Sequence, residues 1–452
     1  MHTDVGQQAG SYDDVVLVAG ELDRNGARRY HRRIVAVRFL STKTASRLLS
    51  FPVIGGAAGV LYALLIVIAL SHDPAGDEQP LVNRLGNRAG MADRLIMLER
   101  APDWEKGEKS FVEVDRDRVV LSGGREKDYP RQGTWTSAEI QLEMPSTEFI
   151  PSWNGAVPAN CGMRLELRTA RRGDWSPWLY FGSWGKTPKT LERVTWFGDG
   201  EVYIDNLILE RSATAVQVRV TLFSYELERG VSPQIRRIAL SYSGYAPEIA
   251  AADLASIKLE KSQWARDLKV PFRTQKDAPP ALSNQICSPT SVSMVMQYFG
   301  VNRPTIENAL AIYDSEYDLF GNWARAVERA GEFGLDGWVQ RFRNWEQVKE
   351  QIAKGQPVIA SIAFRNGEFD SAVISRTNGH LIVIRGFTSD GDVIVNDPAS
   401  RDKGEGAIYK AEELGRAWFG HGGVGYVIAK NTEFRSQNSE GAERVGTPAA
   451  SP

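Results

Sequence analysis

The stretch "NQICSPTSVSMVMQYFG", residues 284–300, contains one of the two cysteines among the 452 residues of the chain. Its apolar residues recur at i, i+3, i+4 and i+7, which is the spacing of one face of an α-helix. They are Val292, Val295, Met296 and Phe299. Gly300 follows the last of them and can end the helix. The stretch therefore predicts a helix whose first turn lies at Cys287.

The first turn of this predicted helix favours a reactive thiol at Cys287. Pro289 is tolerated there because the N–H that it lacks would have no partner within the helix. The hydroxyls of Ser288 and Thr290 are candidates for the helix cap. Unpaired backbone N–H groups and the positive end of the helix dipole stabilise a thiolate at this position. Cysteine is also among the most buried residue types, so a nucleophile and a core residue are both open at this point.

Two histidines are candidate partners, because a thiolate nucleophile needs an imidazole base and a group that orients it. Of the five histidines, only His380 and His421 lie in the same C-terminal region as Cys287. His380 opens the predicted strand "HLIVIRGF", whereas His421 lies among the glycines of "FGHGGVG", which are typical of a loop. His380 is favoured, since the next predicted strand, "DVIVNDP", ends in the carboxylate of Asp397.

The two strands and the turn "TSDG" between them predict a β-hairpin that brings Asp397 close to His380. With a four-residue loop, Phe387 pairs with Asp392, and Asp397 lies opposite Ile382. Ile382 points to the same face as His380, because side chains alternate along a strand. Diagonal neighbours on paired strands are about 7 to 8 Å apart, which a side-chain hydrogen bond can bridge. A capping or packing role for His380 stays open, since "NDP" is also a common turn sequence.

An uncharged segment near the N-terminus, "FPVIGGAAGVLYALLIVIAL" at residues 51–70, is long enough to span a bilayer as a helix. Arginines and lysines precede the segment and acidic residues follow it. The positive-inside rule therefore predicts a cytoplasmic tail at 1–50, a transmembrane anchor at 51–71 and an extracytoplasmic remainder. This is the arrangement of a single-pass protein of the cell membrane. A cleaved signal peptide and a buried core helix are the alternatives.

The rest of the chain falls into distinct predicted parts. Residues 72–107 are charged and rich in Gly, Pro and Asp, which is typical of a linker. Residues 108–245 contain short alternating segments separated by turns, a pattern that indicates an antiparallel β-sandwich. Residues 265–430 mix helical and strand patterns, and residues 431–452 lack apolar periodicity, which predicts disorder. The predicted fold class is thus multidomain, with a β-sandwich before an α+β domain.

Tryptophans are dense in the predicted β-sandwich, where they are either core residues or exposed platforms that stack on sugars. They are Trp135, Trp153, Trp175, Trp178, Trp184 and Trp196. A core role is favoured, because large aromatic side chains dominate a thin core between two sheets. The second cysteine, Cys161, is interpreted as a buried apolar residue. In its pattern this segment resembles the carbohydrate-binding-module-like domains that precede peptidase domains in secreted bacterial proteins.

The composition argues against several classes of function. A formal net charge of −2 is close to balanced and gives no sign of a nucleic-acid-binding surface. The sequence contains no CxxC or HExxH spacing and no GxxxxGK[ST] motif. We therefore expect no nucleic-acid partner, and nothing in the sequence predicts a metal or another cofactor.

Four stretches follow, in order, the motifs of a known family: "VPFRTQ", "NQICSPTSVSMVMQYFG", "NGHLIVIRGF" and "DVIVNDPAS". Over residues 268–430 the chain resembles papain-like cysteine peptidases of the bacteriocin-processing type, family thirty-nine, and especially its stand-alone secreted relatives. The resemblance implies a papain-like α+β domain with Cys287 as nucleophile, His380 as general base and acid, and Asp397 as the residue that orients the histidine. It also implies Gln275, the glutamine of "VPFRTQ", as a donor to the oxyanion.

The sequence departs from the family pattern at two places. Ser288 stands where the family usually has glycine, and Gln275 lies farther from the cysteine than usual. Gln285, two residues before Cys287, is therefore a competing oxyanion donor, although Gln275 is favoured. The ATP-binding cassette of the leader-processing transporters is also missing, so a double-glycine leader is not the expected substrate.

These observations predict a membrane-anchored extracytoplasmic cysteine peptidase that hydrolyses peptide bonds through a Cys-His-Asp triad. The expected substrate is a peptide or protein, with a polymer of the cell envelope as the alternative, and the expected membrane contact is one helix. Two other functions stay open. One is a binding or scaffold protein with an inactive peptidase fold, and the other is a cell-wall amide hydrolase or acyltransferase with the same triad.

Overall fold

The computed structural model describes residues 88, 90–122, 131–225 and 231–431, together with the backbone of two short strands near the N-terminus. These strands, β1 (Ala19–Leu22) and β2 (Arg28–His31), pair antiparallel. The chain divides into a unit at Met1–Glu78 and a unit at Gln79–Pro452. The transmembrane anchor predicted at 51–71 and all but the first residue of the tail predicted as disordered lie outside the described residues. No helix within those residues is long and apolar enough to cross a membrane.

The first part of the larger unit is a β domain built from thirteen antiparallel strands. Hydrogen bonds join all of the strands into one branched sheet, rather than into the two separate sheets of a simple sandwich. The elements are β3 (Met91–Leu98), α4 (Ala101–Glu105), β4 (Glu108–Ser110), β5 (Val112–Asp115), β6 (Arg118–Leu121), β7 (Gln132–Thr136), β8 (Ile140–Ala156), β9 (Cys161–Arg171), β10 (Asp174–Trp175), β11 (Leu179–Gly185), β12 (Trp196–Phe197), β13 (Gly200–Tyr203), β14 (Asn206–Ser224) and β15 (Gln234–Tyr245).

The branching follows from the length of strand β14. Residues 207–216 pair with β8, whereas residues 215–224 pair with β9, and residues 219–223 also pair with β7. One long strand can pair with different strands along its length, because its two ends lie in different parts of the sheet. Alternating apolar residues of β14 are fully buried in the common core, as Val216, Val218 and Val220 are.

The tryptophans of the β domain divide between core and surface. Trp135, Trp153 and Trp184 are buried, as the core interpretation predicts, and Cys161 is buried as well. Trp196 is 67% exposed, so the core interpretation is wrong for this residue. The two remaining members of the set, Trp175 and Trp178, are half-buried and lie against the guanidinium of Arg168 at 4.7 and 4.6 Å.

Strand β3 and helix α4 lie within residues 72–107, which the sequence predicts as a linker. β3 pairs with β15 along its whole length, from Met91 opposite Tyr245 to Leu98 opposite Ile238. The two charges inside the strand obscure its pattern, because Asp93 and Arg94 interrupt the apolar alternation. In the fold these charges are paired, for instance through the ion pair between Asp93 and Arg88 at 3.1 Å. The β domain therefore begins earlier than predicted.

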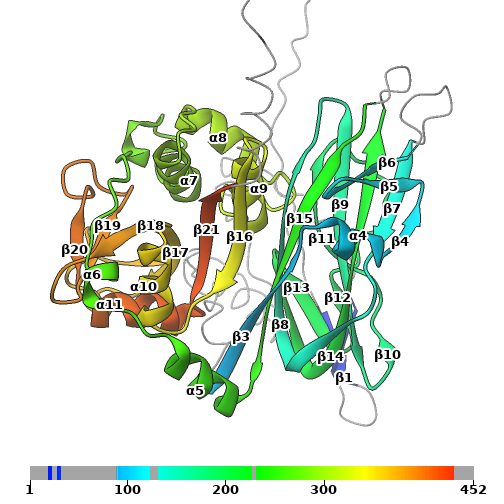
Figure 1. Ribbon diagram of the computed structural model, residues 1–452, viewed down its shortest axis with the longest axis horizontal. Helices are drawn as coiled ribbons and strands as arrows, with labels where there is room; N and C mark the ends of the chain where they lie inside the picture. Colours follow the sequence, from blue (N-terminus) through cyan, green and yellow to red (C-terminus); the bar gives the residue numbers. More distant parts are fainter. Residues whose placement is uncertain are drawn as a thin grey trace, which may run out of the picture. The chain divides into compact units, whose positions relative to one another are not determined.

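The second part of the larger unit is an α+β domain around a six-stranded antiparallel sheet in the order β16-β21-β17-β18-β19-β20. Figure 1 shows helix α7 on one side of strands β17 and β18 and helices α10 and α11 on the other. The elements from β15 onward are α5 (Pro247–Ser256), α6 (Lys261–Trp264), η1 (Gln275–Asp277), α7 (Cys287–Tyr298), α8 (Thr305–Ile312), α9 (Trp323–Gly331), β16 (Leu335–Arg341), α10 (Trp345–Ala353), β17 (Val358–Phe364), β18 (Thr377–Phe387), β19 (Val393–Asn396), β20 (Ala407–Tyr409), α11 (Ala411–Trp418), η2 (Phe419–His421) and β21 (Val424–Lys430).

Helix α7 begins at Cys287, and its residues 288–296 are all buried. The sequence pattern indicated a single apolar face, but the helix is covered on several sides. It packs on strand β18 and against helices α8 and α9. Small polar residues can therefore be core residues here, provided that their hydroxyls find acceptors. Ser291 and Ser293 meet this condition by donating to the carbonyls of Leu381 and Pro289, at 3.1 and 2.7 Å.

The predicted hydroxyl caps of α7 are not formed. The N-cap residue is Ile286, and no side chain caps the helix. Thr290 instead donates back to the carbonyl of Ile286 at 2.6 Å, and the Ser288 hydroxyl lies 3.3 Å from that of Tyr426. At the other end Gly300 has φ +97°, the left-handed conformation expected of a glycine that ends a helix.

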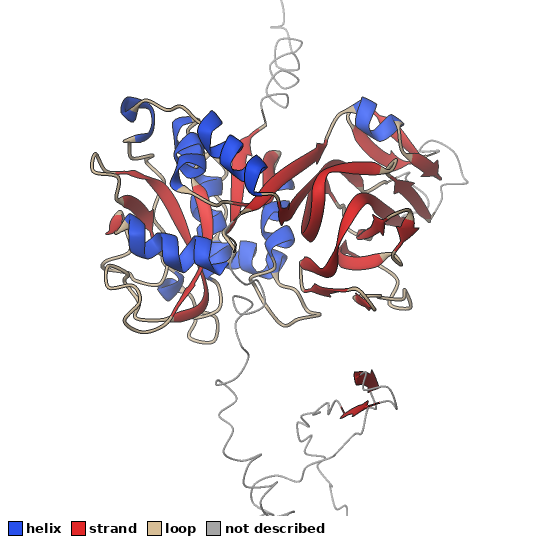
Figure 2. Cartoon of the chain, turned by 90° about the horizontal axis from the view of Figure 1, so that it is seen from below, coloured by secondary structure: helices blue, strands red, loops and turns tan. Residues whose placement is uncertain are grey.

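The β domain covers the free edge of the six-stranded sheet. Strand β16 is an edge strand, and two of its N–H groups are bound by side chains of β8. Gly337 N–H donates to Asn154 Oδ1 at 2.8 Å, and Val339 N–H donates to Ser152 Oγ at 3.1 Å. Figure 2 shows the contrast between the two parts, with most helices gathered around the six-stranded sheet and strands dominating the β domain. Polar side chains that pair with an edge strand hold the two domains in register.

Candidate functional site

Three predicted residues from three different elements meet at the start of helix α7. Cys287 is the first residue of the helix, His380 lies on β18, and Asp397 directly follows β19. His380 Nε2 lies 2.7 Å from Asp397 Oδ1, and the imidazole also forms a hydrogen bond with the Cys287 side chain. Since Nε2 contacts the carboxylate, Nδ1 is the ring nitrogen left for the sulfur. The imidazole and the carboxylate are buried, whereas Cys287 is half-buried.

The hairpin that joins His380 to Asp397 has a different register at its turn from the predicted one. Phe387 pairs with Val393, not with Asp392. A β-bulge at Arg385 then shifts the pairing by one residue, so that Val383 pairs with Asn396. The residue after Asn396 is therefore level with Ile382, as predicted. The one-residue difference at the turn and the one-residue shift at the bulge compensate for each other. The carboxylate of Asp397 therefore still reaches His380.

The surroundings of Cys287 favour its thiolate. Burial opposes ionisation, but the hydrogen bond and the positive charge of His380 act in the other direction. The backbone N–H groups of Leu381 and Ser288 add further donors to the sulfur. Together these groups hold the pKa of the Cys287 thiol below its ordinary value of 9.0.

The same contacts favour a protonated imidazole. Burial works against charge on His380, but the charge of Asp397 and its hydrogen bond raise the pKa of His380 from 6.5 to about 10. For Asp397, burial is outweighed by the positive charge and hydrogen bond of His380, and its pKa lies below 3.8. These opposite shifts favour an ion pair between a Cys287 thiolate and a His380 imidazolium, with Asp397 ionised behind it.

Tyr409 is a member of this site that the sequence did not reveal. Its hydroxyl donates to Asp397 Oδ2 at 2.6 Å and accepts the N–H of Val373 at 3.1 Å. The N–H of Ala399 donates to the other carboxylate oxygen at 2.8 Å. Both oxygens of Asp397 are therefore fixed, and the carboxylate cannot turn away from His380. In the sequence Tyr409 ends a three-residue apolar strand, a pattern that gives no sign of a polar role.

The two candidate glutamines occupy different environments. Gln275 is buried, and its side-chain Nε2 donates to the carbonyl of Ser283 at 2.9 Å. Its backbone N–H donates to the carbonyl of Pro398 at 3.0 Å, which anchors it beside the turn after Asp397. Gln285 is exposed, and its side chain donates to the carbonyl of Ala281 at 2.9 Å. The fold thus buries Gln275 beside the turn that follows Asp397 and leaves Gln285 at the surface.

His421 belongs to a different environment from that of Cys287. It ends the short helix η2, and burial together with the positive charge of Arg341 lowers the pKa of His421 to about 4. No carboxylate contacts its ring among the residues that the structure describes. His421 is therefore neutral near pH 7 and has no orienting partner. In the described part of the chain, no group of three or more His, Cys, Asp or Glu residues could hold a metal ion.

Comparison with known proteins identifies two matched segments. Residues 267–426 match the family model described as "Peptidase_C39 like family", and residues 95–243 match the one described as "Peptidase C39 N-terminal domain". None of the curated proteins matches the chain. The first segment contains all three residues of the site, and the second covers most of the β domain.

Two solved structures show weaker likeness. One is described as a C39-like peptidase from Bacillus anthracis, 18% identical, with 36% of this chain and 96% of that chain covered and a TM-score of 0.28. The other is the enzymatically active domain of tailspike protein 4 of bacteriophage CBA120, 11% identical, with 36% and 20% covered and a TM-score of 0.16. The family models, rather than these likenesses, identify the two domains.

Proposed function

Because the chain belongs to the C39-like peptidase family through residues 267–426, we propose that it hydrolyses peptide bonds with Cys287 as nucleophile. His380 is the general base and acid, and Asp397 orients its imidazole. The observation that carries this proposal is the continuous chain of contacts from the Cys287 thiol through His380 to Asp397, at the N-terminus of a buried helix. This arrangement lowers the pKa of a thiol, which is the requirement for a cysteine nucleophile.

The reaction follows from the roles of these groups. The Cys287 thiolate attacks the carbonyl carbon of the scissile amide and forms a tetrahedral oxyanion. The His380 imidazolium then gives its proton to the leaving amine, and the C–N bond breaks to leave a thioester. The neutral imidazole next takes a proton from water, which attacks the thioester and releases the carboxylate product. Asp397 stays ionised throughout and keeps the same ring nitrogen facing the sulfur.

Two donors are proposed for the oxyanion. One is the backbone N–H of Cys287, since the first N–H groups of a helix have no partner within the helix. The other is the side-chain amide of Gln275, whose Nε2 has a second hydrogen besides the one that binds Ser283. Burial holds this amide in one place, so it costs little to order it in the transition state.

The proposed setting is the outer face of the cell membrane. It is supported by the uncharged segment 51–70 and by the excess of arginine and lysine before it. In this setting the substrate is a peptide or protein outside the cytoplasm. A cell-wall amide has the same reacting bond and is a substrate class that the assay must include.

The test is an assay of the full chain with a mixed peptide library and with purified peptidoglycan, with the products identified by mass spectrometry. Native protein is expected to cleave peptides, and Cys287→Ala and His380→Ala are expected to lose cleavage. His421→Ala is the matched control, because this histidine lies in the same domain outside the site, and it is expected to retain cleavage. An active Cys287→Ala protein contradicts the mechanism. A folded native protein without activity on any substrate indicates the scaffold role instead.

A further inference from the structure

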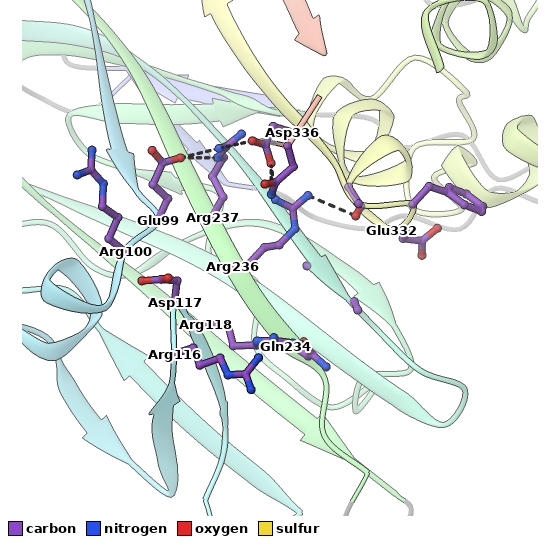
Figure 3. A pocket seen from close by; sticks show the side chains of 16 residues that line it. Glu99, Arg100, Arg116, Asp117, Arg118, Gln234, Arg236, Arg237, Glu332 and Asp336 are labelled. Atoms are coloured by element: carbon purple, nitrogen blue, oxygen red, sulfur yellow. Dashed lines mark hydrogen bonds and ion pairs between the residues drawn. The ribbon is translucent and has the colours of Figure 1, made fainter. Parts of the chain in front are cut away.

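Charged side chains gather in a cavity of about 680 Å³ where the β domain meets the α+β domain, and Figure 3 shows them. Arg236 and Arg237 of β15 form ion pairs with Asp336 of β16, at 2.5 and 2.9 Å. Arg237 also binds Glu99 at 2.6 Å. None of the three residues of the Cys287 site lines this cavity. Its ion pairs join the two domains, so these charged groups belong to the interface and not to the site of the proposed reaction.

Tyr409, in contrast, is a buried polar group that contacts the site itself. A tyrosine hydroxyl has one proton to donate and can also accept a hydrogen bond. Because the N–H of Val373 donates to this oxygen at 3.1 Å, the proton is left for Oδ2 of Asp397 at 2.6 Å. Burial and the charge of Asp397 raise the pKa of Tyr409 above its ordinary value of 10.0, so the hydroxyl keeps its proton near neutral pH. Tyr409 is therefore a fixed donor to the carboxylate.

The two oxygens of the buried Asp397 carboxylate depend on different donors. Oδ1 accepts from His380 Nε2 at 2.7 Å and from the N–H of Ala399 at 2.8 Å. Oδ2 accepts from Tyr409, which is its one donor among the described residues. Without this hydroxyl, a buried charged oxygen has no hydrogen bond, which is unfavourable. The carboxylate then turns about its Cβ–Cγ bond or takes up a proton, and in both cases its hold on the His380 imidazolium weakens.

The ring of Tyr409 is fixed as well, by contacts with residues 369–373 in the connection between β17 and β18. Phe369 packs edge-on against the ring, with 5.0 Å between the ring centres. Ser371 Oγ accepts the N–H of Lys410, the residue after Tyr409, at 3.0 Å. Ring, backbone and hydroxyl are all held in place. A residue that orients a charged group in a site needs this rigidity.

We propose that Tyr409 is a positioning residue, whose hydroxyl holds the carboxylate of Asp397 in the orientation that stabilises the His380 imidazolium. It acts through Asp397. The inference rests on the proposed function for its effect on catalysis. Its effect on the Cys287 thiolate, however, can be measured whether or not the chain cleaves peptides.

The experiment measures the alkylation of Cys287 by iodoacetamide in the full chain, because this reaction needs no peptide substrate. Tyr409→Phe removes the hydroxyl and keeps the ring that packs on Phe369. A weaker hold on the imidazolium leaves less thiolate. Below the native midpoint of reactivity, alkylation is therefore expected to be about threefold slower or more, which corresponds to half a pKa unit or more. The buried thiol of Cys161 reports any unfolding. If the native chain cleaves peptides, kcat should fall about tenfold with KM little changed.

A double-mutant cycle tests whether Tyr409 acts through Asp397. Asp397→Ala removes both carboxylate oxygens, so adding Tyr409→Phe to it is expected to change the alkylation rate by less than about 1.5-fold. A purely structural role of the hydroxyl would slow alkylation equally in both backgrounds. Tyr180→Phe is the matched control, because Tyr180 is a buried tyrosine of the β domain whose hydroxyl donates to Oε1 of Glu316 at 2.9 Å. This control is expected to react as the native chain does.

The proposal is overturned if Tyr409→Phe reacts at the native rate, or if its effect is equally large in the Asp397→Ala background. If Cys161 shows that Tyr409→Phe is unfolded, Phe369→Leu takes its place. This variant loosens the ring and keeps the hydroxyl, and the same two outcomes overturn the proposal. A native Cys287 that reacts as an ordinary thiol contradicts the proposed function and this role together. A reactive native Cys287 that is unaffected by Tyr409→Phe contradicts the positioning role alone.

Discussion

His380 Nε2 lies 2.7 Å from Oδ1 of Asp397, and this contact depends on a bulge in the hairpin that connects the two residues. The bulge residue, Arg385, is held at both ends of its guanidinium. Its Nε and Nη2 donate to the carboxylate of Asp267 at 2.6 and 2.9 Å, and its Nη1 donates to Asn396 Oδ1 at 3.0 Å. The register that aligns the imidazole with the carboxylate is therefore fixed by a charge pair outside the site.

The charge of Asp397 is expected to control the protonation of His380. Asp397→Asn keeps an acceptor for Nε2 but removes the negative charge, so the pKa of His380 should fall from about 10 by roughly one unit or more. Titration of histidine-labelled protein by NMR measures this directly. His421, whose pKa is about 4, serves as the internal control and should titrate unchanged. An unaltered His380 titration in Asp397→Asn would show that the carboxylate does not stabilise the imidazolium.

The two glutamines are expected to differ in their effect on catalysis. Gln275→Ala removes a buried amide proposed to bind the oxyanion and should lower kcat by about 10² to 10³, with little change in KM. Gln285→Ala removes an exposed side chain and should change kcat by less than about twofold. Steady-state kinetics on the best peptide substrate compare the two. A larger loss in Gln285→Ala than in Gln275→Ala would reverse the assignment.

Much of the site could be predicted from the sequence for two reasons. Cysteine and histidine are rare in this chain, and two of the three site residues lie on one hairpin. The chain has two cysteines and five histidines, and the hairpin places His380 and Asp397 close together within one supersecondary unit. Tyr409 could not be predicted in this way. It reaches Asp397 only because β20 pairs with β19, and a tyrosine in a short apolar strand looks like an ordinary core residue.

The features of the fold that were not predicted also depend on contacts between segments that are distant in the sequence. The α+β domain was predictable because its helices and strands have clear periodicity, whereas strand β3 has charges that only tertiary ion pairs explain. The branched sheet was not predictable either, since the alternation within β14 does not reveal that its two ends pair with different strands. The interface between the domains depends on polar side chains such as Asn154, and the spacing of apolar residues gives no information about such contacts.

The contact between Asn154 and strand β16 is expected to stabilise the joined domains. Asn154→Ala leaves the buried N–H of Gly337 without its acceptor and should lower the free energy of unfolding by about 2 kcal/mol. Urea denaturation followed by tryptophan fluorescence measures the change. Asn366→Ala, at an exposed position, is the control and should stay within about 0.5 kcal/mol of the native protein. Equal stability of the two variants would mean that the edge contact is dispensable.

A buried carboxyl at the same interface is expected to make stability depend on pH. Asp205, in the turn between β13 and β14, accepts the N–H of Trp323 at the start of α9 at 2.7 Å. Burial raises the pKa of Asp205 from 3.8 to about 7, although the bond from Trp323 opposes this. The folded protein therefore binds more protons than the unfolded one between about pH 4 and 7, and the free energy of unfolding falls as pH rises through this window.

Asp205→Asn removes this titration and should reduce the decline in stability between pH 4 and 7. Some decline should persist, because burial also raises the pKa of Glu328 on helix α9, and this carboxyl acts in the same direction. Melting temperatures of the native and variant proteins at several pH values test the prediction. A slope that is the same in both proteins would exclude Asp205 as its source.

The central claim is that Cys287 is a thiolate stabilised by His380, and the rate of its alkylation by iodoacetamide as a function of pH tests this most directly. Mass spectrometry of the full chain separates Cys287 from Cys161, whose buried thiol reports any unfolding. Native Cys287 is expected to react rapidly well below pH 9.0, and His380→Ala should move the midpoint of reactivity to higher pH. The account is contradicted if Cys287 of the folded native protein reacts with the pH dependence of an ordinary thiol, or if His380→Ala leaves its reactivity unchanged.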